Sequence, residues 1–181
     1  MKATGIVRRI DELGRVVIPK EIRRTLRIKE GDPLEIFTDR DELMLKKYSP
    51  IATLEKFGDA TAKSLNDLSG LLTVICDTDE VLAVAGEGKR EVGRHLSREM
   101  DKILKDRRSY LADRSAGGEI LPVTEDEAGE NYYAQLIIPI VSGGDCLGAV
   151  VLLSLKDGVK VETFAIKLAQ LTAEMLANQF E

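Results

Sequence analysis

Two short runs rich in β-branched residues open the chain, and the polar residues between them predict a hairpin. The runs span residues 5–10 and 15–18, and Asp11-Glu12-Leu13-Gly14 supplies the Asp and Gly that a tight connection favours. Pro19 has no N–H for a strand ladder, and its fixed φ suits the first position of a helix. We therefore expect a hairpin with its tip near Gly14, followed by a short helix over residues 20–27.

On that expected helix, Ile22 and Leu26 are four residues apart and share one apolar face. This spacing turns Arg23, Arg24 and Arg27 towards the flank and the solvent. The helix therefore displays its arginines on the surface.

A second strand pair is expected over residues 34–38 and 43–47, after a turn at Gly31-Asp32-Pro33. Four short strands and one helix bury too little surface to be comfortably stable alone. The first two strands also carry apolar residues on both faces, Ile6 and Val7 among them. Strands of this kind need a partner that covers them, which predicts an obligate dimer with interlocked hairpins.

Beyond Ser49-Pro50, apolar residues at three- and four-residue spacing predict an amphipathic helix over residues 51–69. Gly58 lies on the same face and weakens the pattern. Two interpretations stay open. The helix either packs on its own domain or pairs with its symmetry mate as a linker between two modules.

From Gly70 onward, strand-like runs alternate with helical patterns. Ser142-Gly143-Gly144-Asp145 joins two strong strand patterns and is a clear hairpin signal. The expected strands cover residues 71–76, 81–85, 120–123, 134–141 and 146–154, and the expected helices cover 96–108, with Ser97 at its start, and 161–180. The pattern predicts the α+β class, with an antiparallel sheet between helices.

Charge divides the chain into a basic and an acidic part. Residues 1–50 contain 12 Lys+Arg and 9 Asp+Glu, a net of +3, whereas residues 51–181 contain 14 and 22, a net of −8 within the total of −5. An electrostatic attraction for a polyanion would therefore come from the first part, with the acidic remainder turned away from phosphates.

Seven of the basic residues lie between residues 5 and 28, against three acidic ones. A charged run of this kind is commonly a solvated face. Here, however, the arginines come from both a hairpin and the helix after it, and the guanidinium fork suits phosphates and guanine edges. Composition alone leaves a solvated face and a nucleic-acid surface equally open.

The run T-G-I-V-R-R-I-D-E-L-G-R-V-V-I-P-K-E-I-R-R-T-L, from Thr4, resembles the N-terminal module of the AbrB-type transition-state regulators, with similarity extending to Tyr48. The resemblance implies a domain-swapped hairpin dimer that binds double-stranded DNA. By motif position, the implied DNA-contacting residues are Arg8, Arg15, Arg23 and Arg24, with Arg9 and Lys20 as weaker candidates.

Arg27 departs from that pattern, because relatives commonly place Gly there before the Ile. The departure leaves the end of the helix open, although Gly31 could supply the turn. Related swapped-hairpin modules also serve in antitoxins, so an antitoxin-like or other protein-interaction role is the alternative function. Antitoxins usually append a short toxin-binding tail, and this chain continues into a second folded pattern.

The run L-I-I-P-I-V-S-G-G-D-C-L-G-A-V-V-L-L-S, from Leu136, resembles a GAF domain, a small-molecule sensor module built on an antiparallel sheet with helices on one side. That resemblance implies a pocket walled by residues 93–133. No cofactor is expected. A small-molecule ligand of the GAF-like domain stays open, because no signature selects one.

The two resemblances together divide the chain into a DNA-binding domain (1–50), a linker helix (51–69) and a GAF-like sensory or oligomerisation domain (70–181). This arrangement resembles transcription regulators of late sporulation, which activate some forespore genes and repress others. It implies a tetramer, with dimers paired through the GAF-like domains.

Membrane, metal and catalytic functions find little support. No apolar run approaches the roughly 18 residues of a membrane span, and the N-terminus lacks a signal-peptide core, so we expect a cytoplasmic protein. Cys76 and Cys146 lie in strand-like runs, as buried core residues do, and His95 is the single histidine. Some GAF proteins reduce free methionine sulfoxide with cysteines. That enzyme would require exposed, reactive thiols, and we expect no enzyme activity.

Overall fold

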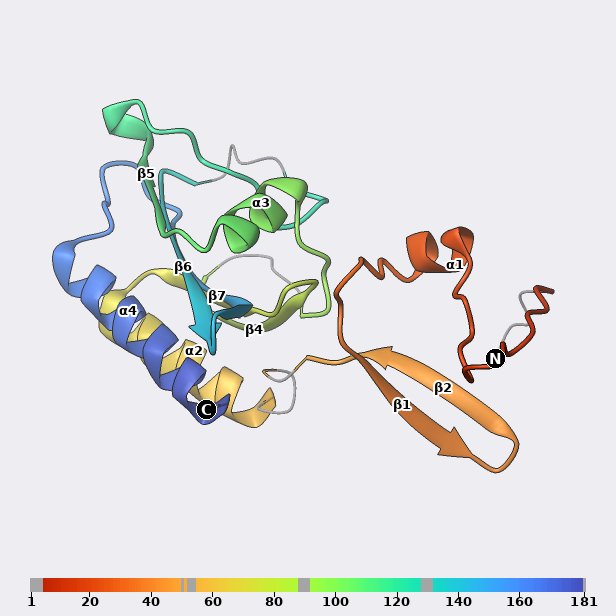
Figure 1. Ribbon diagram of the computed structural model, residues 1–181. Coiled ribbons are helices and arrows are strands. Elements are labelled where there is room, and N and C mark those ends of the chain that lie inside the picture. The colour runs from red at the N-terminus through yellow and green to blue at the C-terminus, as the bar shows by residue number, and fades with distance from the viewer. Residues whose placement is uncertain (1–4, 50, 52–54, 88–91, 128–131, 181) are drawn as a thin grey trace. The chain divides into compact units, whose positions relative to one another are not determined.

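The computed structural model of this chain falls into two compact units, unit 1 (Met1–Tyr48) and unit 2 (Ser49–Glu181). Figure 1 labels the helices and strands of both. The structure describes residues 5–49, 51, 55–87, 92–127 and 132–180.

Unit 1 consists of helix α1 (Lys20–Thr25) and a hairpin of β1 (Leu34–Asp39) and β2 (Glu42–Lys47). The hairpin register runs from Leu34 opposite Lys47 to Asp39 opposite Glu42, which leaves a two-residue loop. Arg40 takes a φ of +49° in that loop, a conformation that costs a side-chain-bearing residue energy.

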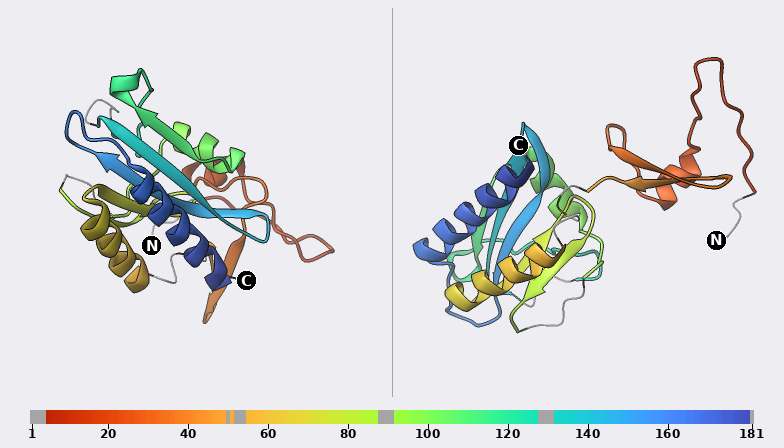
Figure 2. Two further views of the ribbon diagram at one scale, coloured as in Figure 1. Left: turned by 90° about the vertical axis from the view of Figure 1, so that its left-hand side faces the viewer. Right: turned by 90° about the horizontal axis from the view of Figure 1, so that it is seen from below.

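The prediction of strands over residues 5–10 and 15–18 is wrong for the single chain. Both segments are described, but neither pairs as a strand (Figure 2, right). Their apolar side chains stand in solvent, and Val7 and Val17 are 89% and 73% exposed. A strand exists only against a neighbour that accepts its ladder, and no other described part of unit 1 pairs with these segments as a strand.

Unit 2 is a five-stranded antiparallel sheet with the order β4-β3-β7-β6-β5. The strands are β3 (Leu72–Cys76), β4 (Val81–Ala85), β5 (Tyr110–Asp113), β6 (Ala134–Ser142) and β7 (Asp145–Ser154). Gly143 and Gly144 form the two-residue loop between β6 and β7 with φ of +56° and +90°. This is the expected glycine hairpin.

Helices cover both faces of this sheet. On one face, α2 (Glu55–Ser69) and α4 (Thr163–Ala177) lie side by side, and on the other lies α3 (Arg98–Asp106) (Figures 1 and 2). Short 3₁₀ turns cover Arg114–Ala116 and Asn178–Phe180. The arrangement with helices on one side, which the GAF resemblance implied, is therefore wrong for this sheet. The fold class itself, mixed α+β with an antiparallel sheet, is confirmed.

Alternate residues of the central strands supply two hydrophobic cores. Leu136, Ile138 and Leu152 face α2 and α4, whereas Ile137 and Val151 face α3. Because both faces are buried, the sequence of these strands is apolar almost without interruption. Helix α2 contributes Ala62 and Leu65 to the first core, which favours the interpretation that it packs on its own domain.

Gly148 marks the closest approach of two strands in unit 2. A Cβ at this position would lie 2.0 Å from the carbonyl oxygen of Cys76 on β3. No side chain fits there, because real Cβ atoms do not come that close to backbone atoms.

The strand expected over residues 120–123 is also absent, and β5 replaces it as the neighbour of β6. The buried side chain of Gln135 explains how this segment is held. Its Nε2 donates to the carbonyl oxygen of Leu121, and its Oε1 accepts from the Leu121 N–H, both at 2.9 Å. At Leu121, the side-chain amide of Gln135 thus makes the two backbone hydrogen bonds that a neighbouring strand would otherwise make.

Gln135→Leu should destabilise unit 2, because it leaves the N–H and C=O of Leu121 without partners. We expect a loss of about 2–6 kcal/mol in the free energy of unfolding, at roughly 1–3 kcal/mol for each of the two unpaired groups. Urea denaturation of the full chain measures this, with Gln179→Leu at an exposed position as the control. Equal stability of the two variants would contradict the role of Gln135.

Candidate nucleic-acid interface

Hydrogen bonds of Asp11 hold the turn at the tip of the expected hairpin. The backbone N–H of Asp11 donates to the carbonyl oxygen of Arg15, at 3.1 Å, and its carbonyl oxygen accepts from Gly14. Its Oδ1 also accepts from the backbone N–H groups of Leu13 and Arg15. Gly14 takes a φ of +76°. The turn predicted near Gly14 is therefore present even though the strands beside it are unpaired.

Asp11 also orients the Arg15 side chain. The Nε of Arg15 donates to Asp11 Oδ2 at 2.8 Å, while the guanidinium stays largely exposed. The backbone hydrogen bond from Arg15, and after it this side-chain bond, lowers the pKa of Asp11 below its ordinary 3.8. Because the folded pKa is lowered, this stabilisation of the tip is complete above pH 3.8 and is lost as pH falls through the lowered pKa.

Helix α1 carries three of the other candidates on its surface, Lys20, Arg23 and Arg24. No residue of this helix is buried. Arg23 and Arg24 lie in its last turn, where positive charge interacts favourably with the helix dipole.

Arg27 settles how the helix ends. The Ile28 N–H donates to the Arg23 carbonyl oxygen at 2.8 Å, and the Arg27 N–H donates to that of Arg24 at 3.3 Å. This pair of bonds is a Schellman motif, and Arg27 occupies its left-handed position with a φ of +51°. The helix therefore terminates at the position where relatives place Gly, without needing Gly31.

All six candidates are exposed, and they lie in two consecutive stretches of unit 1. Arg8, Arg9 and Arg15 precede the helix, and Lys20, Arg23 and Arg24 belong to it. Apart from Arg15, none of the six has a salt bridge or side-chain hydrogen bond within the described residues. Their charges are therefore available to an external anion.

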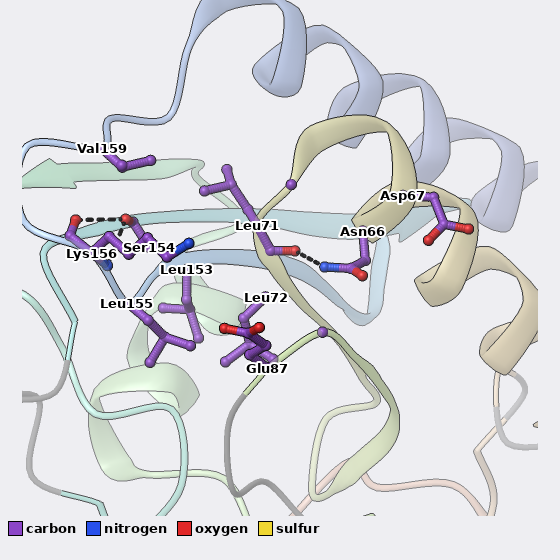
Figure 3. A pocket seen from close by; sticks show the side chains of 12 residues that line it. Asn66, Asp67, Leu71, Leu72, Glu87, Leu153, Ser154, Leu155, Lys156 and Val159 are labelled. Carbon is purple, nitrogen blue, oxygen red and sulfur yellow. Dashed lines mark hydrogen bonds between the residues drawn. The ribbon is translucent and has the colours of Figure 1, made fainter.

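Packed side chains occupy the place where a ligand pocket walled by residues 93–133 was expected. That face of the sheet is filled by a core to which Leu96, Met100, Val123 and Tyr132 contribute. A cavity of about 470 Å³ lies elsewhere in unit 2, and no residue between 93 and 133 lines it (Figure 3). It is bounded by the end of α2 and by strand ends, which no contiguous sequence motif brings together.

The thiols are poorly suited to redox catalysis. Cys76 is fully buried, and its sulfur contacts the carbonyl oxygen of Ala149 at 3.6 Å. Burial raises the pKa of the partly exposed Cys146 thiol, so less of the reactive thiolate is present at neutral pH. His95 lies near the surface, with its Nδ1 3.8 Å from Asp79 Oδ2. Among the described residues, no cluster of His, Cys, Asp and Glu is arranged to hold a metal ion.

Comparison with known proteins decides the family. The model of the stage V sporulation protein T C-terminal transcription-factor family matches residues 53–181. The chain is 49% identical to stage V sporulation protein T of Bacillus subtilis over 185 residues, which span 100% of this chain and 99% of that protein. The chain belongs to the stage V sporulation protein T family. It is thus a member of a family of sporulation transcription factors, and the resemblance of its two parts to sporulation regulators is confirmed.

The two units have separate relatives as well. The transition state regulatory protein AbrB of Bacillus subtilis is 51% identical over 74 residues, which cover 41% of this chain and 77% of that protein. A family model for the MazE antitoxin, described as antidote-toxin recognition, matches residues 7–53. The GAF domain of an Acinetobacter phosphoenolpyruvate-protein phosphotransferase aligns with 69% of this chain and 80% of its own, with a TM-score of 0.56 and 14% identity. The comparison with the GAF domain shows that this chain contains a GAF-like fold.

Arg27→Gly should strengthen the end of α1, because glycine adopts positive φ without a steric cost. We expect the local opening free energy to rise by up to about 1 kcal/mol, so that the Ile28 amide exchanges about fivefold more slowly. Hydrogen exchange of the full chain measures this. Arg40→Gly, also at positive φ but in the β1–β2 loop, should leave the Ile28 amide unchanged, and a slower exchange in both variants would contradict a local effect.

Proposed function

We propose that this protein regulates transcription of late sporulation genes, as an activator of some and a repressor of others, by binding double-stranded DNA through unit 1. The DNA-contacting residues are Arg8, Arg15, Arg23 and Arg24, with Arg9 and Lys20 beside them. The observation that carries this proposal is the set of exposed candidate cations on unit 1, which, apart from Arg15, have no side-chain partner among the described residues. The family and the AbrB relative support it.

DNA binding requires two copies of unit 1 in this account. No residue between 5 and 49 is buried, although many are apolar. A second chain that pairs with residues 5–10 and 15–18 would cover these side chains and complete the strand ladders. The dimer would then present two copies of each arginine to the duplex.

Unit 2 has a surface suited to pairing dimers into a tetramer. Phe164, Leu171 and Met175 follow one another along α4 and are 50–60% exposed, and Leu168 on the same face is partly buried. Phe57 and Leu68 of the neighbouring α2 are also exposed. Apolar residues at this spacing are typical of helix-bundle interfaces.

None of the described helices is both long and apolar enough to cross a bilayer. A regulator that binds chromosomal DNA acts in the cytoplasm, and we include that location in the proposal.

A protein-interaction role is the second candidate, because residues 7–53 match the MazE antitoxin model. In that role the basic surface of unit 1 would contact a protein. The chain aligns with nearly all of the sporulation relative, including unit 2, which favours the transcription role. A well-folded chain that binds no DNA but captures a toxin of that class would support the second candidate.

DNA binding should weaken steeply with salt. If eight arginines, four per chain, each neutralise one phosphate, the slope of log K against log salt should be roughly −7, at ~0.9 per contact on B-DNA. Fluorescence anisotropy of the full chain with a late-sporulation promoter and with scrambled DNA measures the slope and the preference. A slope near −2 would contradict the proposed contacts, whatever the absolute affinity.

Arg23→Ala should reduce the magnitude of this slope by about 2, since a dimer loses two phosphate contacts. Lys102→Ala, which removes an exposed charge from α3 of unit 2, is the matched control and should leave the slope unchanged. Equal effects of the two substitutions would contradict the assignment of Arg23 as a phosphate contact.

Leu171→Glu should convert tetramers into dimers, because it places a charge in the proposed apolar interface. Gln170→Glu adds the same carboxylate at the neighbouring exposed position of α4 and should leave the assembly intact. Analytical ultracentrifugation measures the mass of each. A wild-type chain that is dimeric at all concentrations would refute tetramer formation through unit 2.

A further inference from the structure

Three strand ends meet at the cavity of unit 2. β3 runs antiparallel to both of its neighbours, so its first residue lies between the last residues of β4 and β7. Leu72 of β3 is paired with Leu153 of β7, and the segments that follow β4 and β7 continue past them. The last turn of α2 closes the same cavity.

The walls between these ends are apolar. Leu71 and Leu72 contribute from the start of β3, Leu153 and Leu155 from the end of β7, and Val159 from the loop that follows. Figure 3 shows these side chains grouped between Lys156 on one side and Asn66 on the other. Leu155 and Val159 are exposed at 36% and 42%, so the cavity presents apolar surface to solvent, which is unfavourable when no ligand covers it.

Opposite charges stand at the two sides of this apolar surface. Glu87 follows β4, and Lys156 follows β7. Neither side chain has an ion pair or hydrogen bond within the described part of the chain. Since β3 separates their strands, the two charges arise from strands about 10 Å apart, which is twice the spacing between neighbouring strands.

Asn66, near the end of α2, adds a hydrogen-bond acceptor to the lining. Its Nδ2 donates to the carbonyl oxygen of Leu71 at 2.7 Å, while its Oδ1 has no partner among the described residues. The neighbouring Gly86 packs so closely that a Cβ there would lie 2.6 Å from Asn66 Nδ2. Both Asn66 and Glu87 line the cavity, and Figure 3 shows the Glu87 carboxylate apart from the Asn66 amide. Each oxygen favours a cation at its own position.

We propose that this cavity binds a short apolar peptide with free termini, such as a dipeptide of leucine. The ammonium group binds Glu87, the carboxylate binds Lys156, and the side chains of the peptide cover the leucines between them. An extended dipeptide spans about 7 Å, which leaves room for an ion pair at each end. A free amino acid carries both charges on one carbon and is too short to reach the two sides together.

Calorimetry of the full chain with leucyl-leucine and three analogues tests the proposal. N-acetyl-leucyl-leucine lacks the ammonium, leucyl-leucine amide lacks the carboxylate, and free leucine lacks the length. We expect saturable binding of leucyl-leucine and about fivefold to tenfold weaker binding of each analogue. No heat with leucyl-leucine, or equal affinity for the capped analogues, would overturn the assignment. Preference for free leucine would overturn the conclusion that the ligand is a peptide.

Two variants connect the binding to the named residues. Glu87→Gln should bind leucyl-leucine and its N-acetyl analogue with equal affinity, and Lys156→Gln should lose the preference over the amide. Lys102→Gln on α3, which does not line the cavity, should keep both preferences. If Glu87→Gln and Lys156→Gln also kept both, the assigned groups would be wrong.

The same preparations can be tested for promoter binding. The peptide site goes beyond the DNA-binding role and is independent of it. Intact DNA binding without peptide binding would therefore refute this inference alone, whereas loss of DNA binding by a chain that still binds the peptide would refute only the proposed function.

Discussion

The first fifty residues cannot cover their own apolar side chains, and this constraint governs the organisation of the protein. Unit 1 has no buried residue between 5 and 49, whereas unit 2 buries both faces of a five-stranded sheet. A chain segment with exposed valines and isoleucines gains stability only when another surface removes them from water. Dimerisation is therefore a condition for the fold of unit 1 in the proposed account, and the DNA-binding surface exists only once that fold is complete.

Charge and apolar surface are separated within this arrangement. Net positive charge lies in residues 1–50 and net negative charge in the remainder, so unit 2 is repelled by the phosphates that attract unit 1. Unit 2 instead offers apolar helix faces on α2 and α4 and a cavity at three strand ends. Its proposed contacts are with other copies of the chain and with a small ligand.

Local chemistry in the sequence was sufficient to predict several elements and turns. The glycine pair at 143–144 predicted the β6–β7 hairpin, and the apolar spacing along α4 predicted that helix. The sequence predicted strands at 5–10 and 15–18, which the single chain leaves unpaired, and in our proposal their pairing depends on a second chain. The sequence missed the role of Gln135, since a glutamine that holds a distant backbone segment has no periodic signature. The arginine candidates came from a sequence motif. Asn66, Glu87 and Lys156 are far apart in the sequence, and only the tertiary fold brings them to one cavity.

Hydrogen exchange of the full chain at several concentrations tests the central constraint most directly. We expect backbone amides in residues 5–10 and 15–18 to be protected in the dimer and to lose that protection on dilution, together with unit 1 as a whole. The amides of β3, β6 and β7 should stay protected throughout, because their sheet is complete within one chain. Residues 5–18 that exchange freely at every concentration, while β1 and β2 remain protected, would contradict the account.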